Sequence, residues 1–144
     1  MLPTSLHLEV VTPERRLLDE TVDEVVLPGS QGYLGVLPGH APLLTSLAIG
    51  VLEYRKGNQK HYLAIAWGFA EVLPERVIVL ANIAERPEDI DLPRAEAKKT
   101  EIEEKIRRAQ AEIDLDMLTA SLHKSVTRIQ VARRAQGGGV DVTH

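Results

Sequence analysis

Residues 49–66 read IGVLEYRKGNQKHYLAIA and carry the strongest structural signal in the sequence. Two runs rich in Val, Ile, Leu and Tyr, Ile49 to Arg55 and Lys60 to Ala66, flank the polar segment Lys56-Gly57-Asn58-Gln59. Runs of this composition on either side of a short turn that contains glycine are typical of a β-hairpin. We therefore predict an antiparallel pair of strands at the centre of the chain.

The regions on both sides of this hairpin continue the same pattern. In the first run, Leu6, Leu8 and Val10 alternate with polar residues, so one face of that strand is expected to be buried and the other solvated. Gly and Pro end the runs, as at Pro28-Gly29. The spacing predicts an antiparallel β-sandwich or barrel. Further strand-like runs are Thr21 to Leu27, Leu34 to Leu37, Phe69 to Leu73 and Val77 to Leu80.

After Arg86-Pro87 the hydrophobic period changes to that of an amphipathic helix. Asp91 is placed to cap this helix, and Pro93 is tolerated in its first turn. The pattern resets near residues 113–116, which predicts an antiparallel pair of helices. The first apolar stripe comprises Leu92, Ala95, Ile102, Ile106, Ala109 and Ile113, and the second comprises Leu115, Leu118, Leu122, Val126 and Ile129.

These patterns divide the chain into a sandwich over residues 1–86, a two-helix hairpin over 87–136 and a tail over 137–144. The tail contains three consecutive glycines, whose ordering costs much conformational entropy, so we expect it to be flexible. Each helix alone is marginal in water. The hairpin therefore has to pack onto another surface, and it is a candidate moving part.

The composition excludes several classes of protein. With a net charge of −4 and only 3% aromatic residues, the chain lacks the basic surface and the stacking platforms that nucleic-acid binding uses. The absence of cysteine removes disulfides, thiolate metal sites and cysteine nucleophiles. No apolar run approaches the roughly 18 to 20 residues that span a bilayer, so we expect no direct membrane insertion.

No catalytic or metal-ligating pattern accompanies the five histidines. None is spaced as in HxxxH or HExxH, so no metal site is predicted. An enzyme that uses His40 as a base on a β scaffold is an alternative hypothesis. No nucleophile motif accompanies this residue, however, and a histidine hydrogen-bonded to backbone is the simpler interpretation. We assign no catalytic residue.

The second predicted helix has a surface of one charge sign. It carries Lys124, Arg128, Arg133 and Arg134, and no acidic residue lies among them. Two interpretations are open. The four cations meet an acidic partner, or they complement the dipole at the C-terminus of their own helix at about 0.3 to 1 kcal/mol per charge.

Three segments together resemble the ε subunit of F-type ATP synthases: GYLGVLPGHAPLLTSL over residues 32–47, AWGFA over 66–70 and LEVVTP over 8–13. The resemblance covers the chain to about residue 135. It implies a ten-stranded sandwich that contacts the γ subunit and the ring of membrane proteolipid subunits. It also implies a hairpin that lies compactly on the sandwich or extends along γ into the catalytic α/β head, where it blocks ATP hydrolysis.

The same resemblance implies a non-catalytic rotor subunit that requires no cofactor and lies on the cytoplasmic face of a bacterial inner membrane. It also assigns the contacts by position. The proteolipid-ring contact would comprise Gly29, Ser30, Gln31, Gly32 and Tyr33, and the γ contact would comprise His40, Ala41, Pro42, Leu43 and Leu44. The contact of the extended hairpin with an acidic segment of the catalytic head would comprise Lys124, Arg128, Arg133 and Arg134, which favours the partner interpretation.

Residues 90–95, IDLPRA, match the motif through which some bacterial members of this family bind ATP. The resemblance thus implies regulatory ATP, held by Ile90, Asp91, Arg94 and Ala95. Further basic contacts of those members align with Glu101, Lys124 and Arg128, and a carboxylate in place of a cation should weaken phosphate binding. A plain helix cap at Asp91 and Arg94, and a free-standing nucleotide sensor that works without a synthase, are the alternatives.

Overall fold

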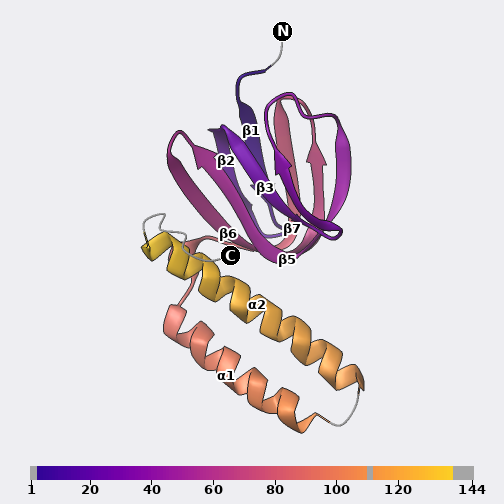
Figure 1. The fold of residues 1–144 in the computed structure, drawn as a ribbon, viewed down its shortest axis with the longest axis vertical. Helices are drawn as coiled ribbons and strands as arrows, with labels where there is room; N and C mark the ends of the chain where they lie inside the picture. The colour runs from indigo at the N-terminus through magenta and orange to yellow at the C-terminus, as the bar shows by residue number, and fades with distance from the viewer. Residues whose placement is uncertain (1–2, 110–111, 138–144) are drawn as a thin grey trace.

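The computed structural model describes residues 3–109 and 112–137, and within them it contains seven strands, one short 3-10 helix and two α-helices (Figure 1). The predicted flexible tail falls almost entirely on residues 138–144, which lie outside the described residues. The strands are β1 Leu6–Val11, β2 Arg16–Val22, β3 Glu24–Gly29, β4 Gly32–Val36, β5 Leu43–Lys56, β6 Gln59–Val72 and β7 Arg76–Glu85, followed by η1 Pro87–Asp89, α1 Leu92–Arg108 and α2 Glu112–Gln136.

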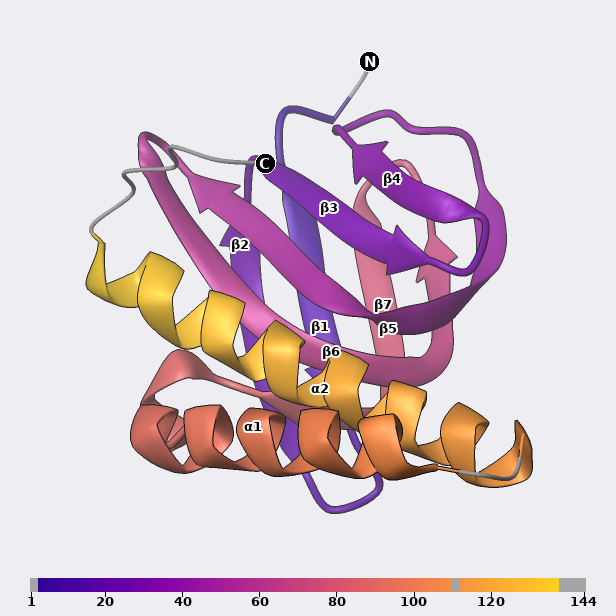
Figure 2. The same ribbon diagram turned by 60° about the horizontal axis from the view of Figure 1, so that its bottom comes forward.

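The strands form one sheet in the order β2-β1-β7-β6-β5-β3-β4. Neighbouring strands run antiparallel except β1 and β7, which run parallel. The sheet curls over on itself, so that its two halves face each other as the layers of a sandwich (Figures 1 and 2). The prediction of an antiparallel sandwich followed by a helical hairpin is confirmed in its architecture.

The implied number of about ten strands is wrong for the described part of the chain, which has seven. The runs Lys60 to Ala66 and Phe69 to Leu73 were expected as separate strands, but they belong to β6, which is 14 residues long. The ladder between β5 and β6 continues across the bend, since Ile49 pairs with Ala66 and Leu47 pairs with Gly68. A bend in a continuous strand, rather than a turn, joins the two layers.

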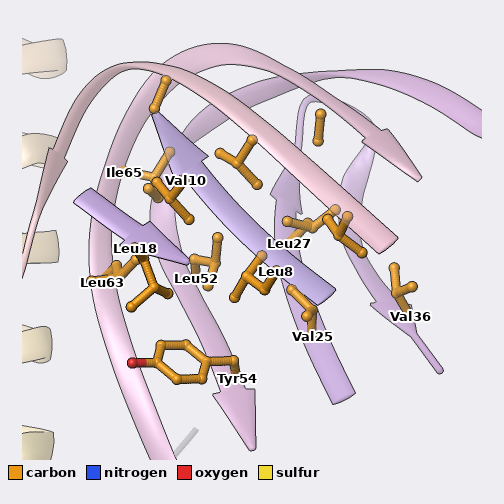
Figure 3. Close-up of a cluster of buried hydrophobic side chains, with 14 of the residues drawn as sticks. Leu8, Val10, Leu18, Val25, Leu27, Val36, Leu52, Tyr54, Leu63 and Ile65 are labelled. Atoms are coloured by element: carbon orange, nitrogen blue, oxygen red, sulfur yellow. The ribbon is translucent and has the colours of Figure 1, made fainter. Parts of the chain in front are cut away.

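The core lies between the two layers and takes side chains from all seven strands (Figure 3). The alternation predicted for the first strand is confirmed, because Leu6, Leu8 and Val10 are fully buried. The hairpin predicted around residues 56–59 is also present, with Lys56 paired to Gln59 across the turn. The core is aliphatic, and Tyr54 is its one aromatic member among the described residues.

Helix α2 lies between α1 and the sandwich, where it packs on β5 and β6 (Figure 2). Asp91 caps α1 as predicted, because its Oδ1 accepts a hydrogen bond from the backbone N–H of Arg94 at 3.1 Å. Helix α1 ends at Arg108, so Ile113 belongs to α2 and not to the first apolar stripe. No helix in the described part of the chain has the length and apolar character needed to cross a membrane.

Candidate functional site

The surface on which α2 rests is a small cluster separate from the main core. It consists of Val51, Tyr62 and Ala64 from the sheet and Val131 from α2, with Ile90 packed against it. We call these five residues the docking seam. The cluster has four buried members, whereas the main core has nineteen, so much less apolar burial holds the helix than holds the sandwich.

All four cations of α2 are engaged by the rest of the chain in this arrangement. The Nζ of Lys124 lies 5.1 Å above the ring centroid of Trp67, and the Arg134 guanidinium lies 5.7 Å from the centroid of Tyr62. Arg128 Nε is 2.6 Å from Glu85 Oε1, and Arg133 pairs with Glu96 of α1. The compact hairpin thus satisfies within the chain the charges that were assigned to an acidic partner.

The ATP-motif residues converge on a pocket of about 590 Å³ between α1, α2 and the end of β7. We call it the motif pocket. It brings together Ile90, Asp91, Arg94, Ala95 and Arg128 from the predicted set, but Lys124 does not line it. Its full lining is Glu85, Asp89, Ile90, Asp91, Arg94, Ala95, Ala97, Lys98, Glu101, Ser125 and Arg128.

The charge of the motif pocket is unfavourable to a polyphosphate. Its lining carries four carboxylates and three cations, and Glu85 already holds one of these cations, Arg128. A hydrogen bond from Lys105, with Lys98 nearby, lowers the pKa of Glu101, so this carboxylate is charged at neutral pH. A triphosphate entering the pocket would face Glu101 and would have to compete with Glu85 for Arg128.

A larger pocket of about 800 Å³ lies beside the turn between β5 and β6, next to η1 and the end of α2. The rings of Tyr54 and His61 stack there with centroids 5.0 Å apart. Burial, and then the nearby Glu20, raise the pKa of Tyr54 to about 12, so its phenol is neutral at physiological pH. Of the predicted site residues, only Arg134 lines this pocket.

The segment assigned to γ leads into an exposed apolar row on β5, β6 and β7. Leu44, Phe69 and Leu80 are 71%, 58% and 55% exposed. Phe69 pairs directly with Leu80, and Leu44 lies diagonally across from Phe69 on the same face. We call these three residues the apolar row. His40, at the start of the segment, has its Nδ1 2.7 Å from the carbonyl oxygen of Ala41, as its simpler interpretation suggested.

The segment assigned to the proteolipid ring is the tight hairpin between β3 and β4, where Gly29 pairs with Gly32. The hairpin is tied to β5, because Ser30 donates its N–H to the Ser46 carbonyl at 3.0 Å. Tyr33 lies back over β5 and accepts a hydrogen bond from the Val51 N–H at 3.3 Å. Only Ser30 and Gln31 form the tip. Because Ser46 is two residues beyond Leu44 on β5, the ring and γ segments lie close together on the sandwich.

Sequence reasoning did not find Trp67, Tyr62 and Glu85, the sandwich residues that hold three of the four cations of α2. It also did not find Phe69 and Leu80 of the apolar row. These residues lie in strands, and their partners come from other elements of the fold. The segment AWGFA, which contains Trp67 and Phe69, was the one signal that could have pointed to two of them. No group of histidine, aspartate and glutamate side chains among the described residues is arranged to hold a metal ion.

Comparison with known proteins relates both halves of the chain to one family. Residues 5–87 match the family model for "ATP synthase, Delta/Epsilon chain, beta-sandwich domain", and residues 88–133 match "ATP synthase, Delta/Epsilon chain, long alpha-helix domain". ATP synthase epsilon chain 2 of Syntrophotalea carbinolica is 46% identical over 92% of this chain and 97% of its own length. The ATP synthase epsilon chain of Solibacter usitatus is 56% identical over 67% of this chain and 72% of its own length.

A solved structure shares the fold. It is a chain in the cryo-EM structure of the Euglena gracilis mitochondrial ATP synthase, OSCP/F1/c-ring, with a TM-score of 0.78 and 24% sequence identity. The alignment covers 94% of this chain and 84% of that chain. At this level of identity the likeness concerns the fold alone.

Proposed function

The chain belongs to the family of ATP synthase delta and epsilon chains, and from this premise we propose how it works: as the central-stalk subunit that couples rotation of the proteolipid ring to ATP synthesis and restrains ATP hydrolysis. The epsilon chain is a stalk subunit of the synthase and not its catalytic one. The observation that carries the proposal is the pairing of a sandwich that has a large apolar core with a helical hairpin whose apolar contact with it is only a small docking seam.

The apolar row supports a contact with the γ subunit. Contiguous large apolar side chains on the outside of a soluble domain mark interaction surfaces. Leu44, Phe69 and Leu80 are exposed together, and the segment His40 to Leu44 runs directly into them. The proposed γ contact therefore comprises this segment, extended by Phe69 and Leu80 on the two neighbouring strands.

The turn between β3 and β4 supports the proposed contact with the proteolipid ring. Its tip is small and polar, and its hydrogen bond to β5 fixes it to the sandwich. A fixed tip transmits torque better than a loose loop, because little of the force is lost in deforming the loop. In this proposal the subunit is peripheral, on the cytoplasmic face of a bacterial inner membrane.

The docking seam supports the role of the hairpin as a brake on ATP hydrolysis. A helix pair that buries few apolar side chains can leave the sandwich without unfolding it. Once it has left, Lys124, Arg128 and Arg134 have lost their partners on the sandwich and are free to meet an acidic segment of the catalytic head. Arg133 joins them when α2 also separates from Glu96 of α1. The compact state in the structure is the state in which these charges are satisfied internally.

The experiment is ATP hydrolysis by the cognate catalytic head with γ, to which either the full chain or a chain truncated after Arg86 is added. We expect both forms to bind and only the full chain to inhibit. If both bind and neither inhibits, the subunit couples rotation but the hairpin is no brake. If neither form binds γ or the assembled head, the stalk assignment fails and the free-standing nucleotide sensor becomes the better hypothesis.

A regulatory role for ATP is the second candidate, and the position of the motif pocket favours it although the charge of the pocket does not. The pocket joins α1, α2 and the end of β7, and Ile90 belongs to both the pocket and the docking seam. ATP bound there would therefore favour the compact hairpin, by a factor set by the ratio of its affinities for the compact and the extended states. Because Glu101 is charged and Glu85 occupies Arg128, we expect weak binding in a titration of the full chain with ATP.

A further inference from the structure

The backbone at Trp67 is unusual. Its φ of 60° makes it the one non-glycine residue with positive φ in the described part of the chain. Bulky side chains rarely adopt this left-handed conformation, and residues held in it cluster at functional positions. The next residue, Gly68, has φ of 128°, and a side chain there would overlap the Leu80 carbonyl oxygen of β7. The bend in β6 thus requires glycine at 68, and glycine would also suit 67.

Burial in the sandwich core does not explain a tryptophan at this position. Trp67 is 40% exposed and is not a member of the main core. Its identified partner is on α2, where the Lys124 ammonium lies 5.1 Å above its ring. Trp67, in its unusual backbone conformation, therefore contributes to the contact between the sandwich and α2.

A second contact follows one helical turn later. Arg128, four residues after Lys124, pairs with Glu85 at 2.6 Å, and both side chains are about two-thirds buried, at 34% and 28% exposed. Val131 and then Arg134 continue along the same face of α2, against the docking seam and Tyr62. Lys124 and Arg134 are about 15 Å apart along a helix, and Trp67 and Tyr62 are about 17 Å apart along a strand, so the two series match in length.

We propose that Trp67 and Glu85 form a latch that holds α2 in the compact state by engaging Lys124 and Arg128. An acidic partner of α2 has to displace both latch residues before it can bind these cations. If the latch raises the ratio of docked to undocked α2 by some factor, it lowers the apparent affinity of that partner by the same factor. The effect of undocking on the synthase rests on the proposed function above. The latch itself is a property of the isolated chain and is tested there.

The test is hydrogen exchange of the isolated full-length chain, followed separately for α2 amides and for amides of the buried strands. Undocking exposes a helix that is marginal alone, so α2 exchange reports it. Lys124→Gln is expected to speed α2 exchange by about twofold to fivefold, the range for a partly exposed cation–π contact. Lys105→Gln is the matched control, because Lys105 lies on α1 and its ion pair is with Glu101.

Two further variants separate a latch from a structural role of Trp67. Trp67→Gly and Trp67→Asn fit the left-handed backbone, so they are expected to leave exchange in the buried strands unchanged or slower while α2 exchanges faster. The proposal is overturned if these variants speed exchange in the strands and not in α2, or if Lys124→Gln behaves like Lys105→Gln.

The chain also carries its own optical reporter, because Trp67 is its only tryptophan. Acrylamide quenching of Trp67 fluorescence is expected to increase in Lys124→Gln and in Glu85→Gln, and to stay at the wild-type value in Lys105→Gln. Equal quenching in all four proteins contradicts the latch. Neither result bears on binding of the sandwich to γ, so failure of the latch and failure of the proposed function are distinguishable.

Discussion

Replacing Val131 by alanine is expected to undock α2 without unfolding the sandwich. Val131 is fully buried in the docking seam, whereas Val79 is fully buried in the main core. Val131→Ala and Val79→Ala therefore remove the same two methyl groups from sites of equal burial. At about 0.8 kcal/mol per buried methyl-sized group, each loses about 1.6 kcal/mol, and the residual cavity adds to this.

The two variants are expected to lose this free energy from different equilibria, docking of α2 in one and folding of the sandwich in the other. For Val131→Ala, about 1.6 kcal/mol is expected to raise the undocked population of α2 somewhat more than tenfold, since tenfold corresponds to about 1.4 kcal/mol. For Val79→Ala, the loss falls on the free energy of unfolding of the sandwich. Amides of α2 should exchange about tenfold faster in the first variant, while the urea midpoint of the sandwich falls only in the second.

This reasoning is refuted if Val131→Ala lowers the urea midpoint of the sandwich as much as Val79→Ala does. The helices and the sandwich would then unfold as one cooperative unit, and a hairpin that leaves the sandwich intact would be energetically excluded. The same outcome would remove the support for a brake on ATP hydrolysis.

Three further predictions concern other parts of the molecule. Glu101→Arg is expected to tighten ATP binding by about tenfold, because it replaces a carboxylate that repels the phosphates with a cation that attracts them. The control Glu103→Arg, on the same helix but outside the pocket lining, should leave the ATP titration unchanged. Gly68→Ala is expected to lower the free energy of unfolding in urea by about 4 kcal/mol or more, because the new methyl group overlaps the Leu80 carbonyl. Gly57→Ala, at φ of 61° with open space around it, should lower it by about 1 kcal/mol. Similar losses in both variants would contradict the close contact at the bend. The pKa of Tyr54 is about 12 in the folded chain against an ordinary 10.0. Between these pH values Tyr54 ionises in the unfolded chain and not in the folded one, so the free energy of unfolding falls as pH rises. Tyr54→Phe should reduce this alkaline loss of stability in unfolding measured from pH 9 to about pH 12, and an unchanged slope would assign the loss to other groups.

Short-range patterns in the sequence predicted those features of the fold that depend on residues close together in the chain. The alternation of Leu6, Leu8 and Val10 predicted the buried face of β1, and Asp91 predicted the start of α1. Both features depend on residues within a few positions of each other.

The continuity of β6 could not be predicted in this way. Gly68 looks like the end of a strand, but Leu47 and Ala81 pair with it from both neighbouring strands and hold it in the ladder. The buried face of α2 was predicted only in part, because Ile129 of the second stripe is buried but the stripe omits Ser125 and Thr127. Ser125 and Thr127 are buried because α2 packs on α1 and on the sheet at once, so that two of its faces are covered. One apolar stripe cannot describe a helix that is covered on two sides.

The cations of α2 show why a charge pattern alone left two interpretations open. Lys124 and Arg128 have a partner within the chain in the compact state, and the same two charges are proposed to meet an acidic segment in the extended state. A pattern that satisfies two competing contacts contains no information on which of them is stronger. That balance depends on Trp67 and Glu85, 57 and 43 residues away in the sequence from the cations they hold. If these two contacts together favour docking tenfold, an acidic partner loses tenfold in apparent affinity, so substitutions in the sandwich should tune inhibition without altering any residue that touches the catalytic head.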